Sequence, residues 1–192
     1  MGLIFPAAVA AGIVTDYFLH EHFRPKHYPC TALVSVAACI ILQALVPDTA
    51  LRIKGLLFAE LMILAGYIDI KTHEIPDILP ALIFAVGFIG LSPVKAISGF
   101  FAVSLPFYIM ARITDGKAVG GGDIKYIAAA GFVLGPFEVM AGALTAITLI
   151  GIYYGIKNTI HHFEKKTESC AMAPWLGTGC FIAYILFNGG IT

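Results

Sequence analysis

Two aspartates are candidates for chemistry because each lies at the edge of a long apolar stretch. Asp123 follows three consecutive glycines, Gly120, Gly121 and Gly122, and opens an apolar segment. Asp69 ends an earlier apolar run and precedes a polar one. Ionisable groups at such positions are costly in a membrane protein and are functional candidates by default. Two carboxylates held a few ångströms apart cannot both ionise easily, so such a pair shares one proton.

A proton-sharing pair of carboxylates has the chemistry of an aspartic protease. The ionised member takes a proton from water while the protonated member polarises a carbonyl, without a metal or a cofactor. The glycines lack side chains, so a substrate backbone could approach Asp123 closely. We therefore predict Asp69 and Asp123 as catalytic residues, the three glycines as a substrate-approach loop, and no metal or cofactor.

Three charged neighbours are weaker candidates for the same site. Lys125 either anchors its segment at the membrane interface or tunes the field at Asp123. Asp77 follows a proline, where a helix N-cap is expected, and we favour the cap. Glu74 could shape substrate recognition. Asp69 and Asp123 have the same simpler alternative, since either could cap a helix end.

Two further acidic residues lie within apolar runs, and we expect structural polar contacts for both. Glu60 is nine residues before Asp69, about half a turn out of phase at about 100° per residue, so the two do not share a helix face. Asp16, near the end of the first run, is interpreted in the same way.

The composition indicates a membrane protein. The 192 residues are 59% hydrophobic and 12% charged, with a mean hydropathy of +0.88, whereas soluble domains have about 25% charged residues. The net charge is zero, which gives no electrostatic basis for binding nucleic acid. The apolar start, 1–19, lacks a basic beginning and a small-residue cleavage site, so we interpret it as a retained span.

Polar residues, glycines and prolines divide the chain into apolar runs. The predicted fold is all-α: a polytopic membrane bundle of seven or eight segments, forming one integral membrane domain over 1–192. The eighth depends on 124–134, which is shorter than the roughly 20 residues that cross a bilayer and ends at a Gly-Pro pair. The predicted segments are 2–19, 31–46, 55–70, 78–91, 95–112, 124–134, 137–156 and 172–188.

The distribution of basic residues predicts the orientation. With eight spans, nine Lys and Arg lie on one side and three, Arg52, Lys54 and Lys95, on the other. Loops rich in Lys and Arg face the cytoplasm, so both termini are expected outside. Asp69 and Asp123 then share the cytoplasmic side, which supports pairing them. The nine are Arg24, Lys26, Lys71, Arg112, Lys117, Lys125, Lys157, Lys165 and Lys166.

Cysteines and histidines give no convincing metal site. None of the four cysteines forms a Cys-x-x-Cys pair, and we interpret them as small buried residues. The histidines lie mostly in two expected loops and lack a ligand spacing with acidic or cysteine partners. These residues are Cys30, Cys39, Cys170, Cys180, His20, His22, His27, His161 and His162.

Over roughly 55–188 the chain resembles the type IV prepilin peptidases, membrane aspartic proteases of the GxGD class. In that family an aspartate precedes an Ile-Pro-Asp element, as Asp69 precedes 75–77 here. A second element, Gly-x-Gly-Asp-x-Lys, corresponds to 120–125. A Pro- and Gly-containing start of the last span corresponds to 173–179, Ala-Pro-Trp-Leu-Gly-Thr-Gly.

The resemblance implies a function. Such enzymes remove a short basic leader from prepilins or prepilin-like proteins at the cytoplasmic face of the inner membrane, with Asp69 and Asp123 as the catalytic aspartates. Long bacterial members also carry a domain with two Cys-x-x-Cys pairs and methylate the new N-terminus. The corresponding loop here, about 20–30, has only Cys30, so the resemblance implies a compact, peptidase-only member. The expected partners are a prepilin-like substrate and membrane lipid.

Two other classes of function compete with this one. A proton- or ion-coupled transporter could use the same carboxylates. It should show internal repeats and acidic residues near the midplane, whereas the chain shows no convincing repeat and its two aspartates sit at one edge. A catalytically silent assembly factor is the third, and the intact aspartate pair argues against it. The oligomeric state does not follow from the sequence.

Overall fold

The described part of the chain is entirely helical. The computed structural model describes residues 4–23, 31–116, 119–160 and 171–189, and these form eight helices and no strand. The all-α prediction is therefore confirmed for these residues. The helices are α1 (Ile4–Phe23), α2 (Thr31–Leu45), α3 (Thr49–Thr72), α4 (Ile78–Val86), α5 (Pro93–Ile113), α6 (Gly121–Leu134), α7 (Pro136–Ile160) and α8 (Ala173–Asn188).

Helix α3 is longer than the predicted 55–70 because both of its ends are capped locally. Asp48 is the N-cap, and its carboxylate accepts the backbone N–H of Ala50 at 2.7 Å. At the other end His73 adopts a left-handed conformation, φ 54°, and its N–H bonds to the carbonyl of Asp69 at 2.8 Å. This C-cap ends the helix one turn after Asp69 and fixes the backbone that carries its side chain.

The segment 124–134, whose status as a span was open, is a separate short helix. Helix α6 begins at Gly121 and ends where Gly135 takes φ 109°, a conformation that favours glycine. Pro136 then starts α7, as expected of proline in a first helical turn. Helix α4 is shorter than the predicted 78–91, since it ends at Val86 and a turn follows.

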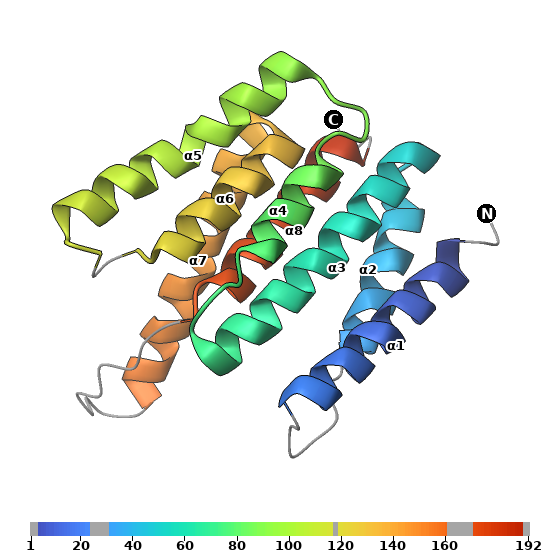
Figure 1. Cartoon of the computed structure of the whole chain (residues 1–192), viewed down its shortest axis with the longest axis horizontal. Helices are drawn as coiled ribbons and strands as arrows, with labels where there is room; N and C mark the ends of the chain where they lie inside the picture. Colours follow the sequence, from blue (N-terminus) through green and yellow to red (C-terminus); the bar gives the residue numbers. More distant parts are fainter. Residues whose placement is uncertain (1–3, 24–30, 117–118, 161–170, 190–192) are drawn as a thin grey trace.

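Helices α4 and α8 connect the two sides of the bundle. Figure 1 shows α1, α2 and α3 on one side and α5, α6 and α7 on the other, with α4 and α8 between them. Helix α3 packs against α2, α4 and α8, and α6 packs against α4, α5, α7 and α8. A site that uses residues of both α3 and α6 therefore lies next to α4 and α8, which contact both of these helices.

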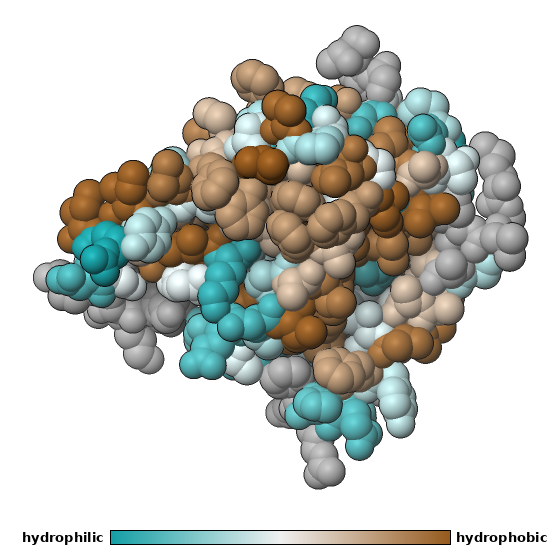
Figure 2. Space-filling model, turned by 45° about the horizontal axis from the view of Figure 1, so that its top comes forward, coloured by the Kyte–Doolittle hydropathy of each residue, from teal (hydrophilic) through white to brown (hydrophobic). Residues whose placement is uncertain are grey.

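The outer surface of the bundle is strongly apolar. Large hydrophobic side chains are exposed on every described helix except α6, among them Val94 at 81% and Ile113 at 77%, and they cover much of the face in Figure 2. Monomeric soluble proteins rarely expose such large patches. Within the described residues, two helices have the length and hydropathy to cross a membrane, Pro93–Ile113 and Pro136–Lys157, and α2 and α8 are apolar but shorter. The eight-span arrangement remains a prediction.

Candidate active site

Asp69 lies in the last turn of α3, where the start of α8 covers it. The residue is buried, with 5% of its surface exposed. Its carboxylate accepts the backbone N–H of Ala173, the first residue of α8, at 2.8 Å. The N-terminus of a helix carries a partial positive charge and unpaired N–H groups, so it favours a negative charge there. Asp69 is thus held in place and supported as a carboxylate by a helix 104 residues away in the sequence.

Asp123 lies in the first turn of α6, ahead of the apolar part of that helix. It is partly buried, and the backbone N–H of Gly120, the N-cap residue, hydrogen-bonds to its carboxylate. In a capping box, the side chain of the third helical residue accepts the backbone N–H of the N-cap residue. Asp123 makes this contact, so it helps to cap α6, as the simpler alternative predicted. A side chain at Gly120 would meet the carboxylate, since a Cβ there would lie 3.2 Å from Oδ2.

The two other glycines of the predicted approach loop form the first turn of α6. Gly121 has open space around it, with nothing within 4 Å of a Cβ placed there. Gly122 packs against Ile75, whose Cβ would lie 3.4 Å from such an atom. The open side next to Asp123 is therefore at Gly121, while Gly122 serves the contact with the α3–α4 turn.

Tyr126 and Ala173 connect the elements that carry the two aspartates. Tyr126 follows Asp123 by three residues, so both lie on the same face of α6. Its side chain is fully buried, and its hydroxyl donates to the carbonyl of Ala173 at 3.4 Å. The N–H of the same Ala173 donates to Asp69. One residue of α8 thus links Asp69 on α3 to Tyr126 on α6.

The two carboxylates interact electrostatically. Burial, and next the negative charge of Asp69, raise the pKa of Asp123 from its ordinary 3.8 to about 6, while the hydrogen bond from Gly120 opposes the shift. The structure therefore brings Asp69 and Asp123 to the same end of the bundle and into each other's field. Such an arrangement can hold one proton on Asp123 and a negative charge on Asp69.

The charged neighbours form an ion pair beside this site. The ammonium of Lys125 lies 2.7 and 2.8 Å from the two carboxylate oxygens of Asp77, and both side chains are exposed. Asp77 does occupy the N-cap position of α4, but its side chain makes no capping bond. The predicted capping role is therefore wrong, because the carboxylate is directed to Lys125. Glu74 is exposed in the α3–α4 turn.

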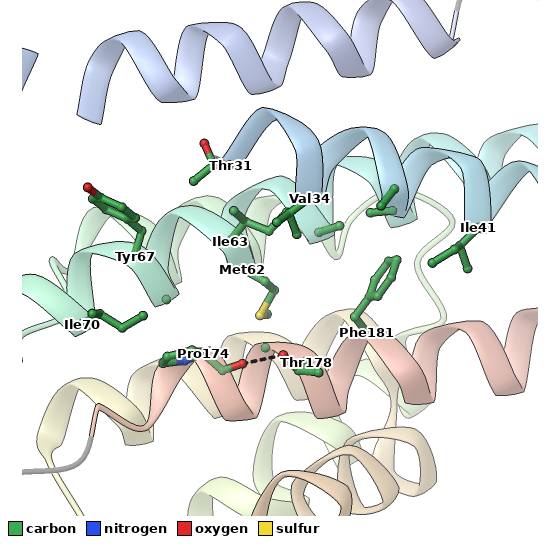
Figure 3. Close-up of a pocket in the computed structure, with 15 residues that line it drawn as sticks. Thr31, Val34, Ile41, Met62, Ile63, Tyr67, Ile70, Pro174, Thr178 and Phe181 are labelled. Carbon is green, nitrogen blue, oxygen red and sulfur yellow. Dashed lines mark hydrogen bonds between the residues drawn. The ribbon is translucent and has the colours of Figure 1, made fainter. Parts of the chain in front are cut away.

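An apolar groove runs from the middle of the bundle toward Asp69. It has a volume of about 410 Å³ and is lined by α2, α3 and α8. Figure 3 shows Met62 of α3 pointing toward α8, and Phe181 of α8 pointing back across the groove. The end nearest Asp69 includes its neighbour Ile70 and the start of α8. Gly66 keeps these helices close, since a Cβ there would lie 3.1 Å from Pro174.

Glu60 and Asp16 make the structural contacts that we predicted. Glu60 Oε2 accepts the hydroxyl of Ser35 on α2 at 2.9 Å. Asp16 on α1 accepts the backbone N–H groups of Thr31 and Ala32, at 3.0 and 3.2 Å, and so caps the start of α2. Neither contact involves Asp69 or Asp123.

Cysteines and histidines are only partly covered by the structure. Cys39 and Cys180 are buried, as predicted. Within the described ranges no group of three His, Cys, Asp or Glu side chains is arranged to hold a metal ion. Several residues named above lie outside the described ranges, namely Arg24, Lys26, His27, Cys30, Lys117, His161, His162, Lys165, Lys166 and Cys170.

Sequence reasoning missed the parts played by Ala173 and Tyr126. The Pro- and Gly-containing start of the last helix was noted only as a family element. In the structure this element positions Asp69, because the first backbone N–H of α8 donates to the Asp69 carboxylate. The available signal for Tyr126 was its position three residues after Asp123, because a polar group there shares that helix face.

Comparison with known proteins identifies the family. A model described as the type IV leader peptidase family matches residues 56–156. The chain belongs to this family. The matched region includes both aspartates. No solved structure matches the chain.

Curated relatives of this chain carry consistent names. The chain is 32% identical to a prepilin leader peptidase/N-methyltransferase of Bacillus subtilis, over 82% of this chain and 65% of the relative. A protein of the same name from Pectobacterium carotovorum is 29% identical, over 84% and 61%. One from Escherichia coli K12 is 25% identical, over 95% and 96%. The chain thus spans less than two thirds of the first two, and none of the three has a transporter's name.

Proposed function

We propose that this protein is a membrane aspartic endopeptidase that removes the short basic leader from prepilins or prepilin-like proteins. The observation that carries the proposal is the pair of carboxylates at one end of the bundle, with Asp69 buried on the N-terminus of α8 and the pKa of Asp123 raised to about 6. The family membership supports the peptidase class, and the names of the relatives support the substrate.

The environments of the two aspartates suggest their starting roles. Asp69, which accepts the N–H of Ala173, is the ionised base and takes a proton from a water molecule as the water oxygen attacks the scissile carbonyl carbon. Asp123 gives its proton to the carbonyl oxygen, which becomes the hydroxyl of a tetrahedral intermediate. Asp69 then passes its proton to the leaving nitrogen and the C–N bond breaks. The hydroxyl returns its proton to Asp123, which restores the pair.

The apolar groove gives the substrate a path to this pair. The groove is lined mainly by apolar side chains of α2, α3 and α8, and one end includes Ile70, the chain neighbour of Asp69. An apolar substrate segment placed there would bring the bond before it to the aspartates. On the other side, the open space at Gly121 leaves room for an extended backbone beside Asp123.

We propose a single integral membrane domain over 1–192 with eight spans, located in the inner membrane. The large apolar side chains exposed on the described helices other than α6 support this setting. The site faces the cytoplasm, because Lys71, Arg112, Lys125 and Lys157 lie at the helix ends near it, whereas the opposite ends carry fewer basic residues. We also propose that the protein acts as a peptidase only, since no Cys-x-x-Cys pair is present in the sequence.

Co-expression with a prepilin that carries a basic leader tests the proposal. We expect leader removal by the wild type and none by Asp69→Asn or Asp123→Asn, with the size of the prepilin read by mass spectrometry. Asp48→Asn is the matched control, since asparagine also caps helices and Asp48 lies at the far end of α3. Cleavage that survives either site substitution would exclude the pair, and loss of activity in a chelator would contradict a metal-free mechanism.

A further inference from the structure

A second cavity lies at the opposite end of the bundle from the two aspartates. It has a volume of about 170 Å³ and is formed where the starts of α3, α5 and α7 meet the ends of α6 and α8. Lys54, which lines it, precedes Asp69 by 15 residues on α3, which is about 22 Å at about 1.5 Å per residue. The cavity is therefore separate from the candidate active site.

Lys54 is buried in this cavity without a partner. Only 8% of the residue is exposed, and within the described part of the chain its ammonium makes no hydrogen bond or ion pair. Its neighbour Arg52 is equally buried, at 9%, but donates to the carbonyl of Val46. An ammonium that is largely removed from water and has no counter-charge is unfavourable. The cavity therefore has the electrostatics of an anion site.

Other groups around the cavity favour the same kind of ligand. Lys95 lines it, and so does the N-terminus of α5, where the N-cap Ser92 makes no side-chain capping bond. Unpaired N–H groups at a helix start attract anions. Glu138 also lines the cavity, but it folds back over Gly135 and complements the start of its own helix, α7. Two lysines and one carboxylate leave one net positive charge.

The surroundings of the cavity are apolar. Leu91 lines it at 38% exposure, and the chain neighbours of the lining residues include Val94 at 81% and Phe137 at 76%. We propose that this cavity binds the phosphodiester headgroup of a membrane phospholipid, with Lys54 as the main contact and the acyl chains along the exposed apolar helices. A phosphodiester carries one negative charge, which matches the net charge of the cavity. The inference rests on the proposed membrane setting and not on the peptidase activity.

Lipid binding to the purified, delipidated protein in detergent tests this site. The probes are dioleoyl phosphatidylglycerol, diacylglycerol with the same chains, and inorganic phosphate, with binding followed by native mass spectrometry and thermal unfolding. We expect saturable binding of phosphatidylglycerol that diacylglycerol and phosphate do not reproduce. Lys54→Met should weaken this binding about tenfold or more, as expected for a lost charged hydrogen bond, and Lys95→Met less. Lys157→Met, near the other end of the bundle, should leave it unchanged.

The unfolding temperature of the lipid-free Lys54→Met variant is an independent test of the site. Methionine keeps the unbranched stem of Lys54 and removes the unpaired charge, so Lys54→Met should unfold at the wild-type temperature or above. Equal binding of phosphatidylglycerol by the wild type and Lys54→Met would overturn the proposal. Binding of diacylglycerol or of inorganic phosphate as tightly as phosphatidylglycerol would overturn it as well. Leader cleavage does not enter any of these measurements, so their outcome is independent of the proposed function.

Discussion

At the scale of single residues, the two aspartates differ in what stabilises their charge. Asp69 accepts a backbone N–H at the positive end of α8, whereas the pKa of Asp123 is raised by burial and by Asp69. The sequence alone left open which aspartate starts as base, because both lie at helix ends next to polar turns. The difference comes from α8, whose first residue is 104 positions from Asp69, and no local pattern reveals a contact at that separation.

The pKa of Asp123 predicts the pH dependence of cleavage. Its raised pKa means that the folded protein holds the proton up to about pH 6 and loses it as the pH rises further. If Asp123 is the initial acid, kcat/KM for a prepilin peptide should fall about tenfold per pH unit above about pH 6. Rates measured from about pH 5 to 8 check this, and a rise across that range would contradict the assigned roles.

Tyr126 should act as a positioning residue, because it holds the residue that binds Asp69. Tyr126→Phe keeps the buried ring and removes only the hydroxyl that donates to Ala173. We expect kcat to fall about five- to tenfold, which corresponds to the net free energy of one hydrogen bond. KM should be nearly unchanged, and the pH dependence of kcat/KM should shift. Steady-state kinetics on a prepilin peptide measures all three.

Tyr184→Phe is the matched control for that substitution. Tyr184 is also buried, and its hydroxyl donates to the carbonyl of Leu51 at 2.6 Å, at the far end of α3. It should lower the unfolding temperature without moving the pH profile. Similar kinetic changes in the two variants would mean that Tyr126 acts only on stability.

At the scale of elements, the apolar runs predicted seven or eight segments and left 124–134 open. The contacts between the helices depend on residues that carry no pattern. Helices α5 and α6 touch backbone to backbone at Gly99 and Gly131, where a Cβ on either would lie 2.1 Å from the other's carbonyl oxygen. The sequence around each glycine does not indicate this contact. Asp77 shows the same limit, since its N-cap position was predictable and its pairing with Lys125 on α6 was not.

Gly131→Ala should therefore separate α5 from α6. The added methyl group meets a backbone carbonyl that cannot rotate away, so we expect a loss of about 1–3 kcal/mol in the free energy of unfolding. Gly155→Ala on α7 is the control, because nothing lies within 4 Å of its Cβ position. Alanine there should be neutral or stabilising by up to about 1 kcal/mol. Equal effects in thermal unfolding would contradict the close α5–α6 packing.

At the scale of the whole molecule, the proposed orientation can be tested by thiol labelling. Asp48 lies at the end of the bundle that we expect outside, and Asp115 is exposed in the turn after α5, on the cytoplasmic side. In a cysteine-free background, Cys at position 48 should react with a membrane-impermeant reagent in intact cells. Cys at position 115 should react only after permeabilisation, and the reverse pattern would overturn the orientation.

The central claim is that Asp69 and Asp123 act as one catalytic unit, and the rate of leader removal by purified variants tests it most directly. Asp69→Asn and Asp123→Asn should each lower the rate on the order of a thousandfold or more. Because residues that act as a unit are not additive, the double variant should be no slower than the slower single variant. Substantial cleavage by either single variant, or a double variant slower by the product of the two effects, would contradict the account.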